Sequence, residues 1–258
     1  AGVMADRPSY ILFITDQQRY DHLGCNGHPV LKTPHIDAIA EEGVNYDRFY
    51  VASPVCMPNR ASLMTCRMPS SHGVRSLGIP LHHDNVTFVE LLRAAGYDTA
   101  LIGKSHLQNV TDRPHKLDPH VSRAGFDAPP DELAVAVRSD LKDARYQYEQ
   151  EAFYQDEMAE VPLPFYGFDE YVSVTRHGFN TGGLHARHVR ATAPDAFALR
   201  GRDNQFPHDY SCPQAIRTKV PEEHYSTSYI ADRTCEFLES RDGNPAPFFL
   251  MVSFPDPH

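Results

Sequence analysis

Short segments rich in apolar residues predict β-strands at three points of the chain. They are Tyr10–Thr15, Tyr97–Ile102 and Phe248–Phe254. The first and the last are continuous apolar runs, which are typical of strands that are buried on both faces of a sheet. A shorter segment, Tyr46–Val51, predicts a further strand that leads into a cysteine-containing loop.

Apolar residues at helical spacing predict helices between these strands. The segment Thr33–Gly43 has a Thr-Pro start and a glycine end, and Thr87–Gly96 has a threonine cap, Glu90 as its capping-box residue and a glycine end. Two more helices are predicted over Asp131–Met158 and Pro221–Leu238. Because helices and strands alternate along the chain, we expect an α/β fold with a largely parallel mixed sheet sandwiched by helices.

The length of 258 residues suits one sizeable α/β core and is short for two complete domains, so we expect a single domain over residues 1–258. The segment from about 108 to 220 is richer in proline, histidine, aspartate and arginine. We interpret it as a loop-rich insertion at the edge of the domain that carries the candidate chemistry. The last residues, Pro255–His258, stop where a functional loop should begin.

Histidines are frequent in this predicted insertion. They are His115, His120, His177, His185, His188 and His208. They could shape a substrate pocket or lie on the surface. His185 and His188 are three positions apart without another ligand pair nearby, so a surface loop is favoured over a metal site.

The net charge of −10 argues against nucleic acid or an anionic membrane as the main partner, because both favour basic surfaces. No stretch has the apolar length of a membrane span, and the first residues lack the apolar core of a signal peptide. Five cysteines without a Cys-x-x-Cys pair suggest neither a disulfide framework nor a zinc ribbon. These features together favour a reducing, cytoplasmic setting.

Polar residues suited to catalysis follow three of the predicted strands. Asp16 and Gln17 follow the first, Lys104 and His106 follow the second, and His258 follows the last. The carboxyl ends of parallel strands meet at one edge of a sheet, where open α/β folds bind ligands. A hard cation would bind the Asp16 carboxylate there. Alternatively, Asp16 caps a turn, and Lys104 and His106 are a solvated lysine and an incidental histidine.

A candidate nucleophile lies at a predicted helix start. Cys56 and Arg60 are four positions apart, and Pro58 between them suits the first helical turn. On a helix both side chains project from one face, and Cys56 meets the positive end of the helix dipole. The pair predicts an anion site that contains a nucleophile, and the alternative is a buried structural cysteine.

The stretch Cys56–Arg67 reads Cys-x-Pro-x-Arg followed by Ala-Ser-Leu-x-Thr-x-Arg, and it resembles the signature of the sulfatase family in the alkaline-phosphatase-like superfamily. Cys66 departs from that signature, because the family usually has glycine there. Gly103–His106 resembles the family's Gly-Lys-x-His element, and Ser253–His258 resembles its Ser-Phe-x-x-Pro-His element. The resemblance implies an alkaline-phosphatase-like fold, of which the chain is the N-terminal half.

The resemblance also implies roles for individual residues. Cys56 would be oxidised to formylglycine by a formylglycine-generating enzyme, and the hydrated aldehyde would attack the ester. Arg60 and Lys104 would orient and neutralise the ester oxygens. His106 would assist the deprotonation that releases the product, and His258 would contact the ester near the leaving group.

One divalent cation, Ca²⁺ or Mn²⁺, would be held by Asp16, Gln17 and the modified Cys56, with the remaining ligands beyond residue 258. The implied activity is hydrolysis of small-molecule sulfate esters, as in arylsulfatases. Many sulfatases have Asp-Asp where this chain has Asp16-Gln17, which resembles the phosphonate monoester hydrolases. Hydrolysis of phosphonate monoesters or phosphodiesters is therefore one alternative, and a non-enzymatic, histidine-rich metal-binding protein is another. A homo-oligomer is left open.

Overall fold

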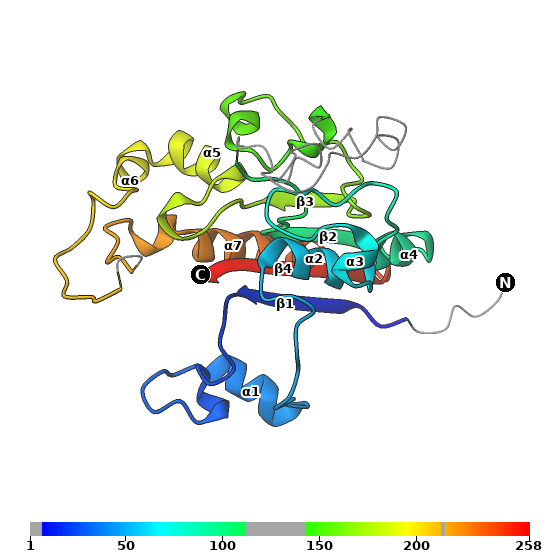
Figure 1. Cartoon of the computed structure of the whole chain (residues 1–258), viewed down its shortest axis with the longest axis horizontal. Coiled ribbons are helices and arrows are strands. Elements are labelled where there is room, and N and C mark those ends of the chain that lie inside the picture. The colour runs from blue at the N-terminus through cyan, green and yellow to red at the C-terminus, as the bar shows by residue number, and fades with distance from the viewer. Residues whose placement is uncertain (1–6, 112–142, 213–214) are drawn as a thin grey trace, which may run out of the picture.

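The computed structural model describes residues 7–111, 143–212 and 215–258 (Figure 1). Within these residues the strands form a four-stranded sheet in the order β1-β4-β2-β3, and every neighbouring pair is parallel. The strands are β1 Tyr10–Asp16, β2 Asp98–Gly103, β3 Glu170–Ser173 and β4 Phe248–Pro257. The α/β fold with a parallel sheet is confirmed, and β1, β2 and β4 lie where strands are predicted.

β3 lies inside the segment that is expected to be a loop-rich insertion. It pairs with β2, from Ala100 opposite Glu170 to Gly103 opposite Ser173. The segment therefore supplies a strand of the central sheet as well as loops. Residues 112–142 of it are outside the described residues, and the single domain with an insertion from about 108 to 220 stays a prediction.

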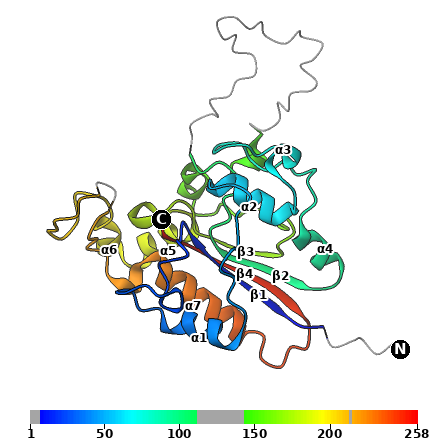
Figure 2. The same cartoon turned by 60° about the horizontal axis from the view of Figure 1, so that its bottom comes forward.

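Helices cover both faces of the sheet (Figure 2). α2 (Cys56–Thr65) and α4 (Phe88–Ala94) lie on one face, and α7 (Ser226–Glu239) lies on the other. The predicted sandwich of helices around the sheet is therefore confirmed.

The predicted capping box is present at the start of α4. The backbone N–H of Glu90 donates to the Thr87 hydroxyl at 3.2 Å, and the Thr87 N–H donates to the Glu90 carboxylate at 2.6 Å.

Each face of the sheet has its own core, because successive strand residues point to opposite sides. On one face, Leu101 and Met251 pack with side chains of α2 and α4 that include Met57. On the other face, Val252 packs with Phe237 of α7. All of these side chains are buried, so the two cores hold the strands firmly and position their carboxyl ends.

The remaining helices are short. They are α1 Pro34–Glu42, α3 Pro69–His72, α5 Gly183–Thr192 and α6 Pro194–Ala198. Short 3-10 helices occur at Gly24–Asn26, Ala144–Tyr146, Glu151–Gln155, Gly178–Asn180 and Glu222–His224. α1, α4 and α7 lie where helices are predicted. Among the described residues, no helix combines the length and the apolar character that crossing a membrane requires.

β1 is less buried than its apolar sequence predicts. Tyr10, Ile11 and Phe13 expose 49%, 42% and 55% of their surfaces, so the prediction that β1 is buried on both faces is wrong. β1 is at the edge of the sheet and pairs only with β4, and the described residues leave much of its surface uncovered. A continuous apolar run does not distinguish such an edge strand from a central one.

The strand predicted at Tyr46–Val51 is absent, because this segment finds no partner strand in the described sheet and its aromatic side chains are largely exposed.

The helix predicted over Asp131–Met158 is wrong over residues 143–158, where the only helices are short 3-10 helices. Residues 131–142 lie outside the described residues. The Gln108 side chain donates to the carbonyl of Arg145 at 2.8 Å and accepts from the N–H of Tyr148 at 2.9 Å. Backbone groups that a helix would pair internally are thus used in contacts across the fold.

Candidate active site

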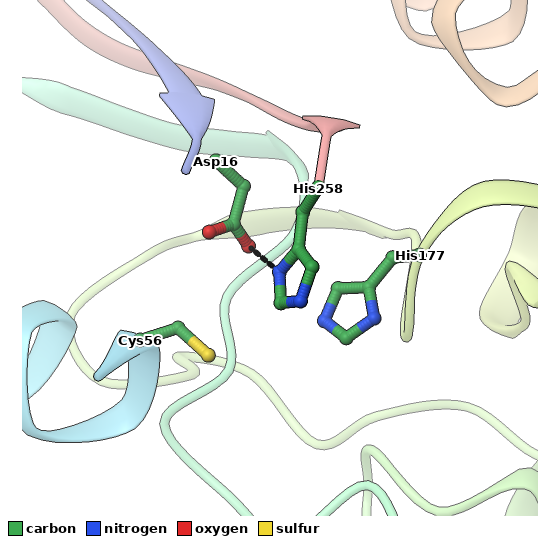
Figure 3. Close-up of side chains that lie close together, drawn as sticks. All are labelled: Asp16, Cys56, His177 and His258. Atoms are coloured by element: carbon green, nitrogen blue, oxygen red, sulfur yellow. Dashed lines mark ion pairs between the residues drawn. The ribbon is translucent and has the colours of Figure 1, made fainter. Parts of the chain in front are cut away.

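The carboxyl ends of three parallel strands carry the candidate chemistry. Asp16 is the last residue of β1, Lys104 directly follows β2, and His258 directly follows β4. Parallel pairing brings these strand ends to one edge of the sheet. Figure 3 shows Asp16, Cys56, His177 and His258 close together, and one donor atom of each lies within 4.8 Å of those of the others. Residues up to 242 positions apart therefore meet at one site.

Asp16 is the acidic group on which the cations of the site converge. The ammonium group of Lys104 forms an ion pair with Oδ2 of Asp16, and Nη2 of Arg60 and Nδ1 of His258 lie 3.8 Å and 3.6 Å from the same oxygen. Burial by itself raises the pKa of Asp16, but the Lys104 and Arg60 cations outweigh it and hold the pKa below its ordinary value. Asp16 is therefore ionised, and among the described residues no hydrogen bond or ion pair involves its Oδ1 atom.

Cys56 is the first residue of α2, and Arg60 follows it one turn later. Pro58 lies in the first turn, where its missing N–H leaves no helical hydrogen bond unmade. The buried guanidinium of Arg60 donates from Nη1 to the carbonyl of Lys104 at 2.7 Å and to the hydroxyl of Ser253 at 2.8 Å. These bonds fix the direction of the Arg60 side chain, so its cation is held near Cys56.

Lys104 is almost completely buried between Asp16 and Arg60. Burial, together with repulsion from Arg60, lowers the pKa of Lys104, while attraction to Asp16 opposes this shift. Two adjacent cations thus lie at the site beside the carboxylate of Asp16, and the buried Glu149 also attracts Arg60. Fixed cations of this kind are suited to an anionic ligand.

His106 is buried next to these charges. Its backbone is left-handed, with φ 54°, and its N–H donates to the carboxylate of Glu149 at 2.7 Å. Burial, with repulsion from Lys104 and Arg60, lowers the pKa of His106 well below the ordinary value, so the ring is neutral. Its Nδ1 atom is buried and has no hydrogen-bond partner among the described residues. This nitrogen therefore keeps an unused hydrogen-bonding position.

His177 belongs to the cluster, although nothing in the sequence distinguishes it from the other histidines of its segment. Its ring stacks on that of His258, with the ring centroids 3.7 Å apart (Figure 3), and burial lowers its pKa to about 3. His177 follows the end of β3 by four residues. The strand-end argument that identifies Lys104 would have found His177 too, but β3 is too short to be recognised from its apolar pattern.

The other histidines of this segment do not join the cluster. His185 and His188 lie on the helix α5, so the predicted loop is wrong for both. The predicted surface position is confirmed for the exposed His188 and wrong for the buried His185. His208 is exposed. His115 and His120 lie outside the described residues.

Gln17 follows Asp16 in a left-handed conformation, with φ 61°, and its side chain is exposed. No hydrogen bond within the described part of the chain ties that side chain to the cluster. Divalent cations such as Ca²⁺ and Mn²⁺ prefer oxygen ligands, and the unpaired Oδ1 of Asp16 fits such an ion. The described residues thus fit part of a cation site, with fewer oxygen donors than the six to eight that Ca²⁺ takes.

Comparison with known proteins identifies the family of this chain. The family model described as Sulfatase matches residues 8–258. The Ulvan-active sulfatase of Formosa agariphila is 39% identical over 121 residues, which cover 47% of this chain and 23% of that protein. The Steryl-sulfatase of Homo sapiens is 40% identical over 116 residues, which cover 40% of this chain and 20% of that protein.

Among solved structures, the phosphonate monoester hydrolase of Agrobacterium radiobacter aligns with a TM-score of 0.63 and 24% identity, over 98% of this chain and 41% of that chain. This likeness shows a shared fold. In each of these comparisons the match spans less than half of the other protein's length. The family model matches nearly all residues of this chain, so the chain belongs to the sulfatase family.

Proposed function

We propose that this protein hydrolyses sulfate esters. The observation that carries the proposal is the position of Cys56, which lies at the start of α2, in a cluster with Asp16 and His258 and near the buried cations of Arg60 and Lys104. The names of the relatives support sulfate esters as the substrate class, because the two proteins that match in sequence over part of this chain are sulfatases.

A sulfate ester is an anion, and its transition state needs fixed positive charge around the transferring group. Arg60 and Lys104 provide this charge, and both are held by contacts to the strand ends before any substrate binds. Their burial excludes water and strengthens the electrostatic interaction. The geometry thus supports binding of the ester oxygens without a large rearrangement of the site.

The nucleophile in this proposal is residue 56 after oxidation of Cys56 to formylglycine, whose hydrated aldehyde has a hydroxyl that attacks sulfur. A formylglycine-generating enzyme is the partner that this maturation requires. The start of α2 presents the positive end of the helix dipole to residue 56, which stabilises the ionised hydroxyl. Deprotonation of the second hydroxyl expels sulfate and restores the aldehyde, and we assign the assistance of this step to His106, whose Nδ1 has no hydrogen-bond partner among the described residues.

The leaving alcohol is assigned to the side of the site that carries His258. In Figure 3 the rings of His258 and His177 lie side by side next to Asp16 and face the same space as Cys56. We assign His258 the contact to the ester near the leaving group, and His177 the task of holding the His258 ring in place. The stacking distance supports this division of roles.

A divalent cation, Ca²⁺ or Mn²⁺, is part of the proposal. Asp16 and the modified residue 56 would hold it, and Gln17 would offer a neutral carbonyl oxygen. When bound, it would offset the negative charges of the ester and of the ionised hydroxyl. Further ligands would complete its coordination.

Hydrolysis of phosphonate monoesters or phosphodiesters is the second candidate. The pair Asp16-Gln17 supports it, because many sulfatases have Asp-Asp there and this pair resembles that of the phosphonate monoester hydrolases. A non-enzymatic, histidine-rich metal-binding protein is not favoured, because the group of described residues that could hold a metal ion combines only two histidines, His177 and His258, with Asp16 and Cys56. We retain the proposal of a reducing, cytoplasmic setting, which the absence of a Cys-x-x-Cys pair among the five cysteines of the sequence supports.

Parallel rates on 4-nitrophenyl sulfate and on 4-nitrophenyl phenylphosphonate test the proposal. Full-length protein from a host that makes formylglycine should hydrolyse the sulfate ester faster, and Cys56→Ser should lose both activities while remaining folded. A faster rate on the phosphonate would favour the second candidate. Full activity of the Cys56→Ser protein would refute both.

A further inference from the structure

A pocket lies beside the segment that carries His177. It has a volume of about 250 Å³ and is formed by the 3-10 helix Glu151–Gln155 together with α5 and α6 and the loops beside them. Its lining contains four arginines: Arg176, Arg187, Arg190 and Arg200. Glu151 is the acidic residue in this lining. The pocket therefore carries an excess of positive charge in a protein whose net charge is −10.

The ion pairs of the pocket do not balance this charge. Arg176 pairs with Glu151, with Nη1 and Oε2 3.0 Å apart. Within the described part of the chain, Arg187, Arg190 and Arg200 form no ion pair with a carboxylate. Burial, with repulsion from Arg190 and Arg176, lowers the pKa of Arg200, although Glu151 opposes that shift. The cations thus lie close enough to repel one another.

The arginines are held in place by groups other than carboxylates. Arg187 donates to backbone carbonyls of the turn at residues 156–159. Arg200 donates to the carbonyls of Phe179 and Thr181. The guanidinium groups of Arg190 and Arg200 also lie over the ring of Phe197, at 5.0 Å and 4.7 Å from its centroid. Rigid, uncompensated guanidinium groups around one cavity are suited to binding an oxyanion, with which they form charge-assisted hydrogen bonds.

The pocket shares a wall with the candidate active site. The segment of residues 176–183 supplies His177 to the cluster of Figure 3, and it supplies Arg176, Phe179 and Asn180 to the pocket. The bonds from Arg200 to the carbonyls of residues 179 and 181 tie the pocket to the same segment. A ligand that occupied the pocket would therefore lie next to the side of the site that carries His258.

We propose that this pocket binds a second anionic group of the substrate, a sulfate or a carboxylate, beyond the ester group that is hydrolysed. This inference rests on the proposed function and narrows the substrate class to sulfate esters that carry at least two negative groups. Arg176, Arg190 and Arg200 contact the second group, and Arg187 shapes the wall. The pocket has room for the part of the substrate that bears the anion as well as the anion itself.

A binding experiment tests the pocket without relying on catalysis. Crystals of full-length Cys56→Ser protein are soaked in selenate, whose selenium is located by its anomalous scattering. We expect a selenium peak among Arg176, Arg190 and Arg200, which Arg190→Gln abolishes and Arg202→Gln, a matched change at an exposed arginine outside the pocket, leaves unchanged. Absence of a peak in the pocket at a selenate concentration that fills the catalytic site would overturn the proposal.

A kinetic experiment tests whether the bound anion belongs to the substrate. The active full-length protein is assayed with 4-nitrophenyl sulfate and with disulfated and monosulfated forms of one disaccharide. Arg190→Gln should raise the KM for the disulfated sugar roughly tenfold or more, because a charge-assisted contact is lost. The KM for 4-nitrophenyl sulfate should not change, and Arg202→Gln should change neither.

Equal effects of Arg190→Gln on the disulfated and monosulfated sugars would overturn the assignment to a second substrate group. A selenium peak in the pocket of a protein that hydrolyses no sulfate ester would refute the proposed function and leave an anion site of another kind. The two experiments thus separate failure of the pocket from failure of the proposed function.

Discussion

The carboxylate of Glu149 accepts a hydrogen bond from the backbone N–H of His106, with Oε1 and N 2.7 Å apart. Its second oxygen accepts the N–H of Gln108 at 2.6 Å, and the Glu149 side chain has no exposed surface. Burial raises the pKa of Glu149, whereas these hydrogen bonds oppose the shift. The left-handed turn that places Lys104 and His106 in the site is thus held by a buried acid that follows it by more than forty residues.

Replacing Glu149 should therefore damage both stability and activity. In Glu149→Gln one backbone N–H faces an amide NH₂ group in place of an acceptor, which should cost about 1–3 kcal/mol of unfolding free energy. Urea unfolding measures the loss, and the rate on the best ester substrate should fall with it because His106 is displaced. Glu157→Gln, a change at an exposed acid of the same segment, is the control. Equal stability of the two variants would show that Glu149 does not hold the turn.

Replacing Cys66 should raise the free energy of unfolding, whereas replacing Glu149 should lower it. It ends α2 with φ 54° and ψ 31°, a left-handed conformation that is unfavourable for residues with a Cβ atom. Cys66→Gly should raise the free energy of unfolding by about 0.5–1 kcal/mol, after the greater flexibility of glycine in the unfolded chain is subtracted. A urea midpoint that falls in this variant would contradict the conformational argument. Cys212→Ser controls for removal of an exposed thiol.

His185 should make the stability depend on pH. Burial lowers its pKa to about 4, although its hydrogen bond to the carbonyl of His224 opposes the shift. The unfolded chain takes up a proton below about pH 6.5, whereas the folded chain does so only near pH 4, so the free energy of unfolding falls as the pH falls through this window.

The loss from this one group should reach about 2 kcal/mol at pH 5. Urea unfolding at pH 7 and pH 5 measures it. His185→Gln should lose this part of the pH dependence, and His208→Gln, at an exposed histidine, should keep it. Identical pH dependence in the His185→Gln and wild-type proteins would show that His185 is not the group responsible.

Arg60→Ala should lower kcat by about 10²–10³-fold, because a fixed cation in a buried pocket is lost. The Lys104 carbonyl and the Ser253 hydroxyl also lose their donor, so Arg60→Lys should recover part of the rate. Arg93→Ala, at an exposed arginine paired with Asp169, should not change the rate. Circular dichroism checks that the variants are folded, and a folded Arg60→Ala protein with full activity would show that Arg60 is structural.

The chemical state of Cys56 can be read by mass spectrometry. In protein made with the maturation machinery, the tryptic peptide Phe49–Arg60 should be lighter by the exchange of sulfur for oxygen and the loss of two hydrogens. Cys25 and Cys235 should remain thiols, because neither lies in a Cys-x-Pro-x-Arg sequence. An active protein whose Cys56 is an unmodified thiol would overturn the formylglycine mechanism.

The sequence by itself determined the features that depend on neighbouring residues. The capping box of Thr87 and Glu90, and the start of α2 with Cys56, Pro58 and Arg60, follow from local hydrogen bonds and helical spacing. Apolar runs located β1 and β4, and the polar residues after strands placed Asp16 and Lys104 at one edge of the sheet. Such features need no knowledge of what lies across the fold.

Only the tertiary structure decided what depends on residues far apart in the chain. His177 enters the cluster because β3, a strand too short to be recognised, pairs with β2 and brings it there. Residues 143–158 do not form the predicted α-helix, and the carbonyl of Arg145 and the N–H of Tyr148 bond the distant side chain of Gln108. The arginine pocket likewise forms only where α5 and α6 meet the segment of residues 176–183. Its arginines belong to that segment, to α5 and to the residues after α6, so only the folded chain brings them together.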